Sequence, residues 1–142
     1  LTALLAEVVG TFATAHRDIN WTLEAEPAPP IPFDAEGLRK VFINLLTNAA
    51  EALEGRTDGE VLVRAANDPA RGLARISVAD NGPGFSQEER ARMFEPYFSR
   101  KKTGTGLGLT IVRSIVMDHK GQVRVEAARP KGSVFVVELP LA

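Results

Sequence analysis

The chain has 142 residues, of which 44% are hydrophobic and 25% charged, and these proportions predict one globular domain with a sizeable core. A net charge of -1, with no basic stripe interleaved with aromatic residues, argues against an electrostatic nucleic-acid binder. The chain has no cysteine, which excludes disulfides, thiolate metal ligands and a cysteine nucleophile and fits a reducing compartment.

The first segment is amphipathic. Apolar residues recur at helical spacing from Leu1 to Phe12, which predicts a helix to about Thr14 within a leading region of residues 1–18. The sequence contains no signal peptide and no long apolar run, and because it does not begin with Met we expect it to be a piece of a longer protein. Residues 19–25 then alternate as a half-buried strand would, and the prolines that follow impose an extended connection.

A strongly periodic segment follows, with Asp34 as its predicted N-cap and an expected end near Glu54 and Gly55. Asn44, Asn48 and Glu51 form a polar stripe at the edge of its apolar arc. A half-buried amide left unpaired costs roughly 1–3 kcal/mol, so the asparagines need a ligand, neighbouring loops or water as partners. The apolar arc, which a helix packed on a sheet requires, contains Leu38, Val41, Phe42, Leu45, Leu46, Ala49, Ala52 and Leu53.

The middle of the chain changes from strand patterns to loop chemistry. The second of two strand patterns runs into Asp80-Asn-Gly-Pro-Gly-Phe85, and Ser86 with Glu89 forms a capping box. The predicted elements are strands at residues 61–65 and 73–78, a loop at 67–72 between them, and a short helix at about 87–93.

The last third begins with a segment that has no clear period. Residues 95–107 carry local positive charge and are typical of a mobile loop, within a lid region that we place at 85–107. Three main helices and about five strands, not regularly alternating, predict an α+β fold, a two-layer α/β sandwich. The remaining elements are a helix from Leu107 to Val116 that ends at His119-Lys120-Gly121, and strands at 122–127 and 133–139 linked by a turn at 130–132.

A glycine-rich segment, Gly104-Thr-Gly-Leu-Gly108, stands where a loop turns into a helix. Glycines let backbone N–H groups approach a ligand closely, and a helix N-terminus adds about half a positive charge, which together favour phosphate. The alternative is a flexible hinge. The segment matches neither the P-loop nor the Rossmann fingerprint, so the common nucleotide folds are poor fits.

Asp80 follows an apolar strand, and Gly82 and Gly84 come directly after it. A carboxylate at a strand end, with glycines clearing space beside it, can accept a hydrogen bond from an exocyclic amine such as that of adenine. The alternative is that Asp80 only stabilises its own turn.

Taken together and in order, these segments resemble the N, G1, F, G2 and G3 boxes of sensor histidine kinases. The resemblance covers nearly the whole chain, to Pro140, and residues 94–101 look most like the nitrogen-regulation subgroup. It implies a Bergerat-type ATP-binding fold over residues 1–142, with a mixed sheet of about five strands, three main helices and a mobile ATP lid. The matching segments are Asn44/Asn48, Asp80-x-Gly82-x-Gly84, Phe94-Glu-Pro-Tyr-Phe98, Gly104-Thr-Gly-Leu-Gly-Leu109 and Gly132-Ser-Val-Phe135.

The resemblance implies a metal site and a base site. Asn48 would supply an amide oxygen to Mg²⁺, with Asn44 assisting directly or through water. Asp80 would bind the adenine amino group directly and through water, helped by Thr110 or its neighbours. The glycines Gly82 and Gly84 would let the lid start close to the base.

The resemblance also implies contacts from the lid. Phe94 and Phe98 would anchor it to the body, although both could be plain core residues. The basic residues Arg100, Lys101 and Lys102 could meet the terminal phosphates or be only solvated. The cofactor-binding stretch, whose glycines would present N–H groups to the phosphates, comprises Gly104, Thr105, Gly106, Leu107, Gly108 and Leu109.

Asn44 distinguishes between related chemistries. Hsp90 chaperones, MutL-type repair proteins, gyrase-type topoisomerases and anti-sigma serine kinases usually carry a glutamate general base at this position. Asn44 cannot accept a proton usefully, which favours a sensor kinase, whose nucleophile is a histidine nitrogen, and predicts feeble ATP hydrolysis. Glu51 departs from the lysine or arginine of many sensor kinases and is expected to be a surface residue or, less readily, a water-mediated metal contact.

Neither His16 nor His119 lies in a His-Glu/Asp-x-x-Asn/Thr-Pro motif, so both are expected to be structural or solvent-facing. The resemblance therefore implies that the chain binds Mg-ATP and donates the γ-phosphate to a histidine on an upstream dimerisation domain, which then serves a response regulator. It implies a cytoplasmic domain, free or part of a membrane-anchored sensor, that is monomeric alone and homodimeric in the full protein, with no nucleic acid bound and no membrane insertion. Two alternatives stay open: a GHKL-type ATPase or anti-sigma serine kinase, and a nucleotide-binding interaction module without kinase activity.

Overall fold

The computed structural model describes residues 1–27, 33–96 and 108–141. Its helices are α1 (Thr2–Ala15), α2 (Ala35–Ala52), α3 (Gln87–Arg92) and α4 (Gly108–Asp118). Its strands are β1 (Asn20–Ala25), β2 (Glu60–Asp68), β3 (Leu73–Asp80), β4 (Gln122–Ala127) and β5 (Ser133–Pro140).

Local sequence signals set the helix ends as predicted. The Asp34 side chain caps α2 by accepting a hydrogen bond from the Glu36 N–H at 3.1 Å. Both halves of the capping box at α3 are formed, because Ser86 Oγ accepts from the Glu89 N–H and Glu89 Oε1 accepts from the Ser86 N–H. After α4 the chain turns at Lys120, whose φ of 61° is left-handed.

The five strands form one mixed sheet in the order β1-β2-β3-β5-β4. β1 runs parallel to β2, and every other neighbouring pair is antiparallel. The parallel pair is joined through α2, which is the long crossover that parallel neighbours require.

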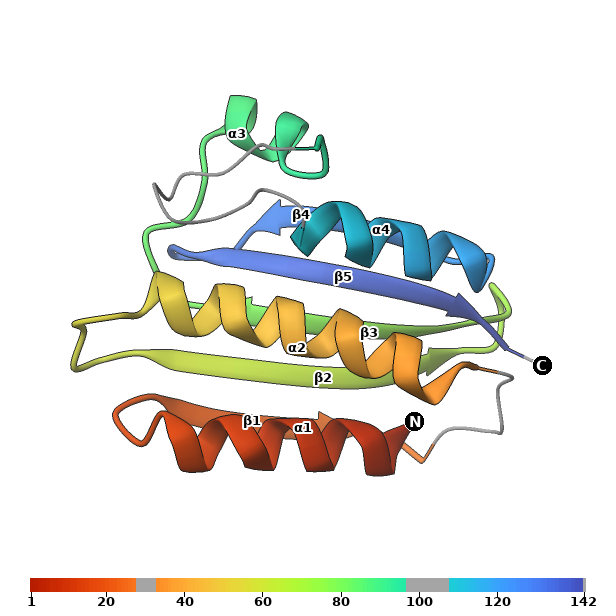
Figure 1. Cartoon of the computed structure of the whole chain (residues 1–142), viewed down its shortest axis with the longest axis horizontal. Coiled ribbons are helices and arrows are strands. Elements are labelled where there is room, and N and C mark those ends of the chain that lie inside the picture. The colour runs from red at the N-terminus through yellow and green to blue at the C-terminus, as the bar shows by residue number, and fades with distance from the viewer. Residues whose placement is uncertain (28–32, 97–107, 142) are drawn as a thin grey trace.

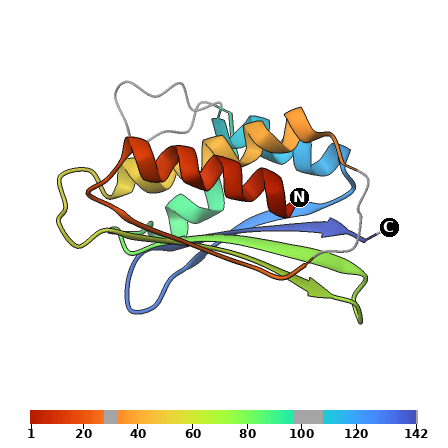
Figure 2. The ribbon, with the colours of Figure 1, turned by 90° about the horizontal axis from the view of Figure 1, so that it is seen from below.

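The molecule has two layers. α1, α2 and α4 all lie on one side of the sheet, in front of it in Figure 1 and above it in Figure 2, where the sheet is seen nearly on edge. No helix of the described residues covers the opposite face. The predicted α+β two-layer sandwich is therefore confirmed. Within the described ranges, no helix has the length and apolar character needed to cross a bilayer.

The core lies between the two layers. On α2 the predicted arc is buried except for the half-buried Ala52, and Leu38, Phe42 and Leu45 are at most 1% exposed. The register places Asp80 opposite Val61 of β2 and Ser133 of β5, on the face that the helices cover. An acidic residue thus ends a row of buried apolar side chains directly beneath the helical layer.

β2 and β3 are longer than their sequence patterns predict. Pairing continues to Asp68 opposite Leu73, so the predicted loop over residues 67–72 shrinks to a tight turn. Some of the added residues are polar and have partners elsewhere in the fold: Asn67, for example, donates its side-chain amide to the Pro27 carbonyl at 3.0 Å. Contacts of this kind are not visible in local periodicity.

The uncovered face of the sheet carries a buried acid beneath arginines. Glu138 is 7% exposed, and its carboxylate lies 2.8 Å from Arg75 and 2.9 Å from Arg124. Burial alone would raise the pKa of Glu138, but the hydrogen bonds and charges of the two arginines outweigh burial and hold it below its ordinary value. The cluster joins β3, β4 and β5.

Candidate functional site

One face of α2 connects two glycine-containing segments. Asn44, Asn48 and Ala52 are spaced four residues apart, so they share that face. The Asn44 side-chain nitrogen donates to the Lys40 carbonyl at 2.8 Å, and its oxygen lies against α4. A Cβ added to Gly108 would come within 2.9 Å of that oxygen, so the absence of a side chain lets α4 begin beside Asn44.

Two turns further along α2, Ala52 contacts the segment that follows β3. A Cβ added to Gly82 would lie 3.1 Å from the Ala52 carbonyl oxygen and 2.9 Å from Asp80 Oδ1. Asn48 is half-buried between these two contacts and makes no side-chain hydrogen bond within the described part of the chain. The predicted N, G1 and G2 segments therefore meet on one face of α2 as far as the structure describes them.

Asp80 is held from two directions. It is 5% exposed, its Oδ1 accepts from the Gly82 N–H at 2.9 Å, and its Oδ2 accepts from the Ser133 hydroxyl at 2.9 Å. Burial raises the pKa of Asp80 above its ordinary value, while the hydrogen bonds from Gly82 and Ser133 act in the opposite direction. Each carboxylate oxygen keeps capacity for a further donor.

Two glycines lie in close contact with the main chain at and after Asp80. Gly84 and Gly132 have φ values of 74° and 105°, which favour glycine. A Cβ on Gly84 would lie 2.8 Å from the Gly132 carbonyl oxygen, and a Cβ on Gly132 would overlap the Asp80 carbonyl oxygen. The turn before β5 and the segment after β3 can therefore approach each other this closely only because Gly84 and Gly132 have no side chains.

The start of α4 is tied to the segment that carries Phe94. The Thr110 hydroxyl donates to the Phe94 carbonyl at 3.2 Å, and the Phe94 ring packs edge-on against Phe135, with centroids 6.4 Å apart. Leu109 packs against the core as well. Ser133, and not Thr110, is the hydroxyl that contacts Asp80.

Sequence reasoning missed Ser133 as a site residue. It lies in the predicted Gly132-Ser-Val-Phe135 segment, but only the pairing of β3 with β5 brings it opposite Asp80. Several predicted residues lie outside the described part of the chain: Phe98, Arg100, Lys101, Lys102, Gly104, Thr105, Gly106 and Leu107. Their predicted roles, and that of the lid, stay predictions.

Both histidines make structural contacts. His119 Nε2 accepts from the Asp34 N–H at 2.9 Å, and His119 Nδ1 donates to the Ile115 carbonyl at 2.8 Å, so the ring links the end of α4 to the start of α2. The His16 ring stacks on Phe12 with centroids 5.8 Å apart, and its carbonyl accepts from the Trp21 indole.

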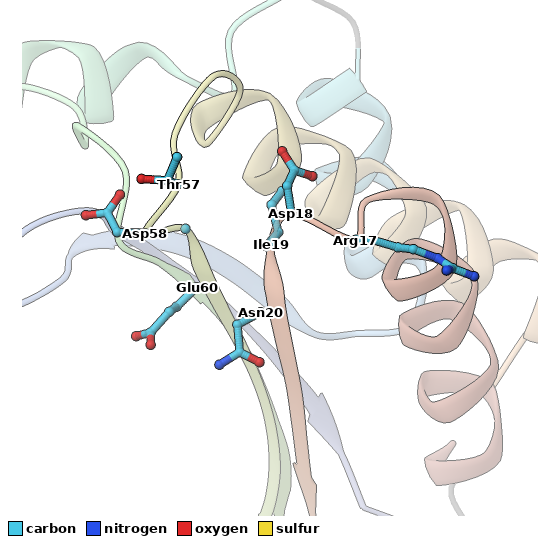
Figure 3. Close-up of a pocket in the computed structure, with 8 residues that line it drawn as sticks. Arg17, Asp18, Ile19, Asn20, Thr57, Asp58 and Glu60 are labelled. Carbon is cyan, nitrogen blue, oxygen red and sulfur yellow. The ribbon is translucent and has the colours of Figure 1, made fainter.

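A separate cavity of about 330 Å³ lies where β1 and β2 begin (Figure 3). None of the residues predicted for the site lines it. The lining residues are Arg17, Asp18, Ile19, Asn20, Thr57, Asp58, Gly59 and Glu60.

Comparison with known proteins agrees with this geometry. The model of the histidine kinase-, DNA gyrase B- and HSP90-like ATPase family matches residues 33–142. The sensor histidine kinase ZraS of Klebsiella oxytoca is 41% identical over 128 residues, which cover 89% of this chain but only 27% of ZraS.

Solved structures give the same result. The nucleotide-free catalytic domain of the histidine kinase ThkA superposes with a TM-score of 0.87 at 33% identity, covering 99% of this chain and 92% of that one. Full-length ShkA in complex with AMPPNP gives 0.84 at 34% identity, covering 99% of this chain and 30% of ShkA. The chain belongs to the histidine kinase-, DNA gyrase B- and HSP90-like ATPase family, and within it to the catalytic domains of sensor histidine kinases.

Proposed function

We propose that this domain binds Mg-ATP and donates the γ-phosphoryl group to a histidine on a dimerisation domain of the same protein. The observation that carries the proposal is the buried Asp80 carboxylate, held by Gly82 and Ser133 at the point where the glycine-containing segments meet α2. Family membership supports nucleotide use by the domain.

The residues around Asp80 suit a purine base with an amino group. An ionised carboxylate can only accept hydrogen bonds, so it pairs with an exocyclic amine and repels a keto oxygen. Gly82 leaves room beside the carboxylate, because a Cβ there would lie 2.9 Å from Asp80 Oδ1, and Gly132 leaves room beside the main-chain carbonyl of Asp80, which a Cβ there would overlap. Ser133 and Gly82 each donate to one carboxylate oxygen, and both oxygens keep capacity for a further donor such as the amino group of the base.

Asn48 and Asn44 are proposed to hold the metal. Among residues 1–27, 33–96 and 108–141, no group of three or more His, Asp or Glu side chains gathers as a metal centre. Mg²⁺ needs few protein ligands when a nucleotide supplies phosphate oxygens, and the amide oxygens of α2 are hard donors of the type it takes. When bound, Mg-ATP supplies the transferable phosphoryl group with its charge partly neutralised.

The same face of α2 favours a protein acceptor over water. Asn44 has no proton-accepting group, and its amide nitrogen is already committed to Lys40. With no general base at this position, the domain contributes positioning and charge neutralisation, and the nucleophile is a histidine nitrogen that needs no activation by α2. A response regulator is the proposed onward acceptor. The nitrogen-regulation resemblance of residues 94–101 also stays a proposal.

The base site is tested by titrating ATP in the presence of Mg²⁺ into the wild type and the Asp80→Asn variant. We expect at least tenfold weaker binding, the equivalent of roughly 1.4 kcal/mol, because a charge-assisted hydrogen bond is lost. Asp68→Asn, at the other end of the sheet, is the matched control and should bind like the wild type. Equal affinity in the Asp80→Asn variant would overturn the assignment.

The reaction is tested by mixing the domain and Mg-ATP with a dimerisation hairpin from a related sensor kinase. Phosphohistidine on the hairpin, with slow ADP release in its absence, is the expected result. Rapid ADP production without phosphohistidine would instead indicate an ATPase, and ATP binding with neither product would indicate an interaction module.

A further inference from the structure

Asn81 makes three hydrogen bonds to the residues at the start of β2. Its main-chain N–H donates to the Glu60 carbonyl at 3.3 Å, and its side-chain oxygen accepts from the Glu60 N–H at 2.8 Å. Its side-chain nitrogen donates to the Asp58 carbonyl at 2.8 Å. We call this set the Asn81 clasp.

The clasp lets the chain leave the sheet without loosening the end of β3. In a regular antiparallel ladder, every second pair of opposed residues exchanges both main-chain hydrogen bonds. At Glu60 and Asn81 one of these bonds goes to the side-chain oxygen instead, so the Asn81 carbonyl is released from the ladder. The chain can then turn while Asp80 stays paired with Val61.

The peptide that follows the clasp is the one that reaches Asp80. The Gly82 N–H, which belongs to the Asn81–Gly82 peptide, donates to Asp80 Oδ1. On the other side, a Cβ on Gly132 would lie 3.0 Å from the Asn81 Cα, so the turn before β5 packs closely against Asn81. The direction of this peptide is thus fixed by the clasp from one side and by Gly132 from the other.

We infer that Asn81 is a positioning residue for base recognition, which acts by fixing the Asp80 carboxylate and the Gly82 amide through its clasp on Asp58 and Glu60. The inference rests on the proposed function. Asp58 and Glu60 also line the cavity at the start of β1 and β2 (Figure 3). Through its hydrogen bonds to them, Asn81 joins the proposed base site to a wall of that cavity.

The test compares ATP with ITP, a purine nucleotide that carries a keto oxygen in place of the amino group. Dissociation constants for both are measured with Mg²⁺ for the wild type, Asn81→Ala, Asp80→Asn and Asn67→Ala. Asn67 is the matched control, because its side-chain amide also bonds a carbonyl, that of Pro27, at the opposite end of β2. Urea unfolding of each variant confirms that the protein is folded in the binding assay.

We expect Asn81→Ala to reduce the ATP:ITP preference roughly 5- to 30-fold. Asn67→Ala should change it less than about twofold. An unchanged preference in Asn81→Ala would show that the clasp is only structural and would overturn the inference. If Asp80→Asn also kept the wild-type preference, the base site itself would be wrong.

Should Asn81→Ala fail to fold, Asn81→Asp carries the same test. This variant keeps an acceptor for the Glu60 N–H. It replaces the amide nitrogen that donates to the Asp58 carbonyl with a carboxylate oxygen, which cannot donate to that carbonyl. We expect it to lose part of the ATP:ITP preference, and a full wild-type preference would contradict the inference.

Discussion

At the scale of single residues, Asp80 combines two opposed requirements. The ionised carboxylate accepts a hydrogen bond from an amine more strongly than the neutral acid does, yet its burial favours the neutral acid and raises its pKa. Gly82 and Ser133 counter that tendency by donating hydrogen bonds to the carboxylate. Ser133 therefore helps to set the pH range over which the base site works.

Removal of the Ser133 hydroxyl should shift the pH range of ATP binding upward. In Ser133→Ala the pKa of Asp80 loses one of its lowering influences and rises further, so the ionised form that we propose to bind adenine disappears at a higher pH. We expect ATP binding roughly fivefold weaker at pH 7, with the acid loss of affinity beginning earlier than in the wild type. Titrations between pH 5 and 8 measure this, with Ser77→Ala on the uncovered face as the control. A pH profile identical to that of the wild type would contradict it.

The sequence indicated Asp80 and its glycines because they are adjacent along the chain. It could not indicate Ser133, because residues 53 positions apart become neighbours only through the register of β3 with β5. Asn81 was visible as part of a loop motif, but its partners Asp58 and Glu60 belong to another strand. Side chains whose partners lie far away along the chain leave no local sequence pattern that would indicate their role.

At the scale of secondary structure, the elements with local signals were predicted best. The cap at Asp34 and the capping box at Ser86 act within one turn of chain, and both helices begin as expected. β2 and β3 were predicted too short, because pairing between strands and contacts such as Asn67 to Pro27 extend them.

Glu138 should contribute to the cohesion of β3, β4 and β5 in a pH-dependent way. Its pKa is lowered in the folded protein, so its stabilising effect is present above its unfolded pKa and is lost as the pH falls through the folded value. We expect Glu138→Gln to lower the free energy of unfolding by about 1–3 kcal/mol at pH 7, and by progressively less as the pH falls below about 4. Urea unfolding at several pH values checks this.

Glu126→Gln is the control for this measurement, because Glu126 is exposed and pairs with the same Arg124 at 2.7 Å. Its effect should stay below about 1 kcal/mol. A pH-independent loss in Glu138→Gln would show that packing, and not charge, accounts for the role of Glu138.

At the scale of the whole molecule, the predicted fold class is confirmed. It could be predicted because the helical and strand periods of the sequence match the observed elements along most of the chain. The strand order β1-β2-β3-β5-β4 was not predicted, since it depends on which strands pair and not on where they lie in the sequence. The site draws on α2, α4, β3 and β5, so nucleotide binding should stabilise the fold as a unit.

This linkage can be measured directly. With Mg-ATP at 100 times its dissociation constant, the free energy of unfolding should rise by about 2.7 kcal/mol. Asp80→Asn at the same ATP concentration should gain much less, because its affinity is lower. Thermal unfolding with and without nucleotide tests this, and equal stabilisation of the two proteins would contradict the assignment of the base site.

The buried Asp80 also has a consequence for how the domain evolves. Its raised pKa means that the ionised carboxylate costs folding stability at neutral pH, so a neutral side chain of similar shape would favour the folded chain. The proposed nucleotide binding is a reason to keep an acid at this position despite that cost, and we expect a lineage that gave up ATP to lose Asp80 early.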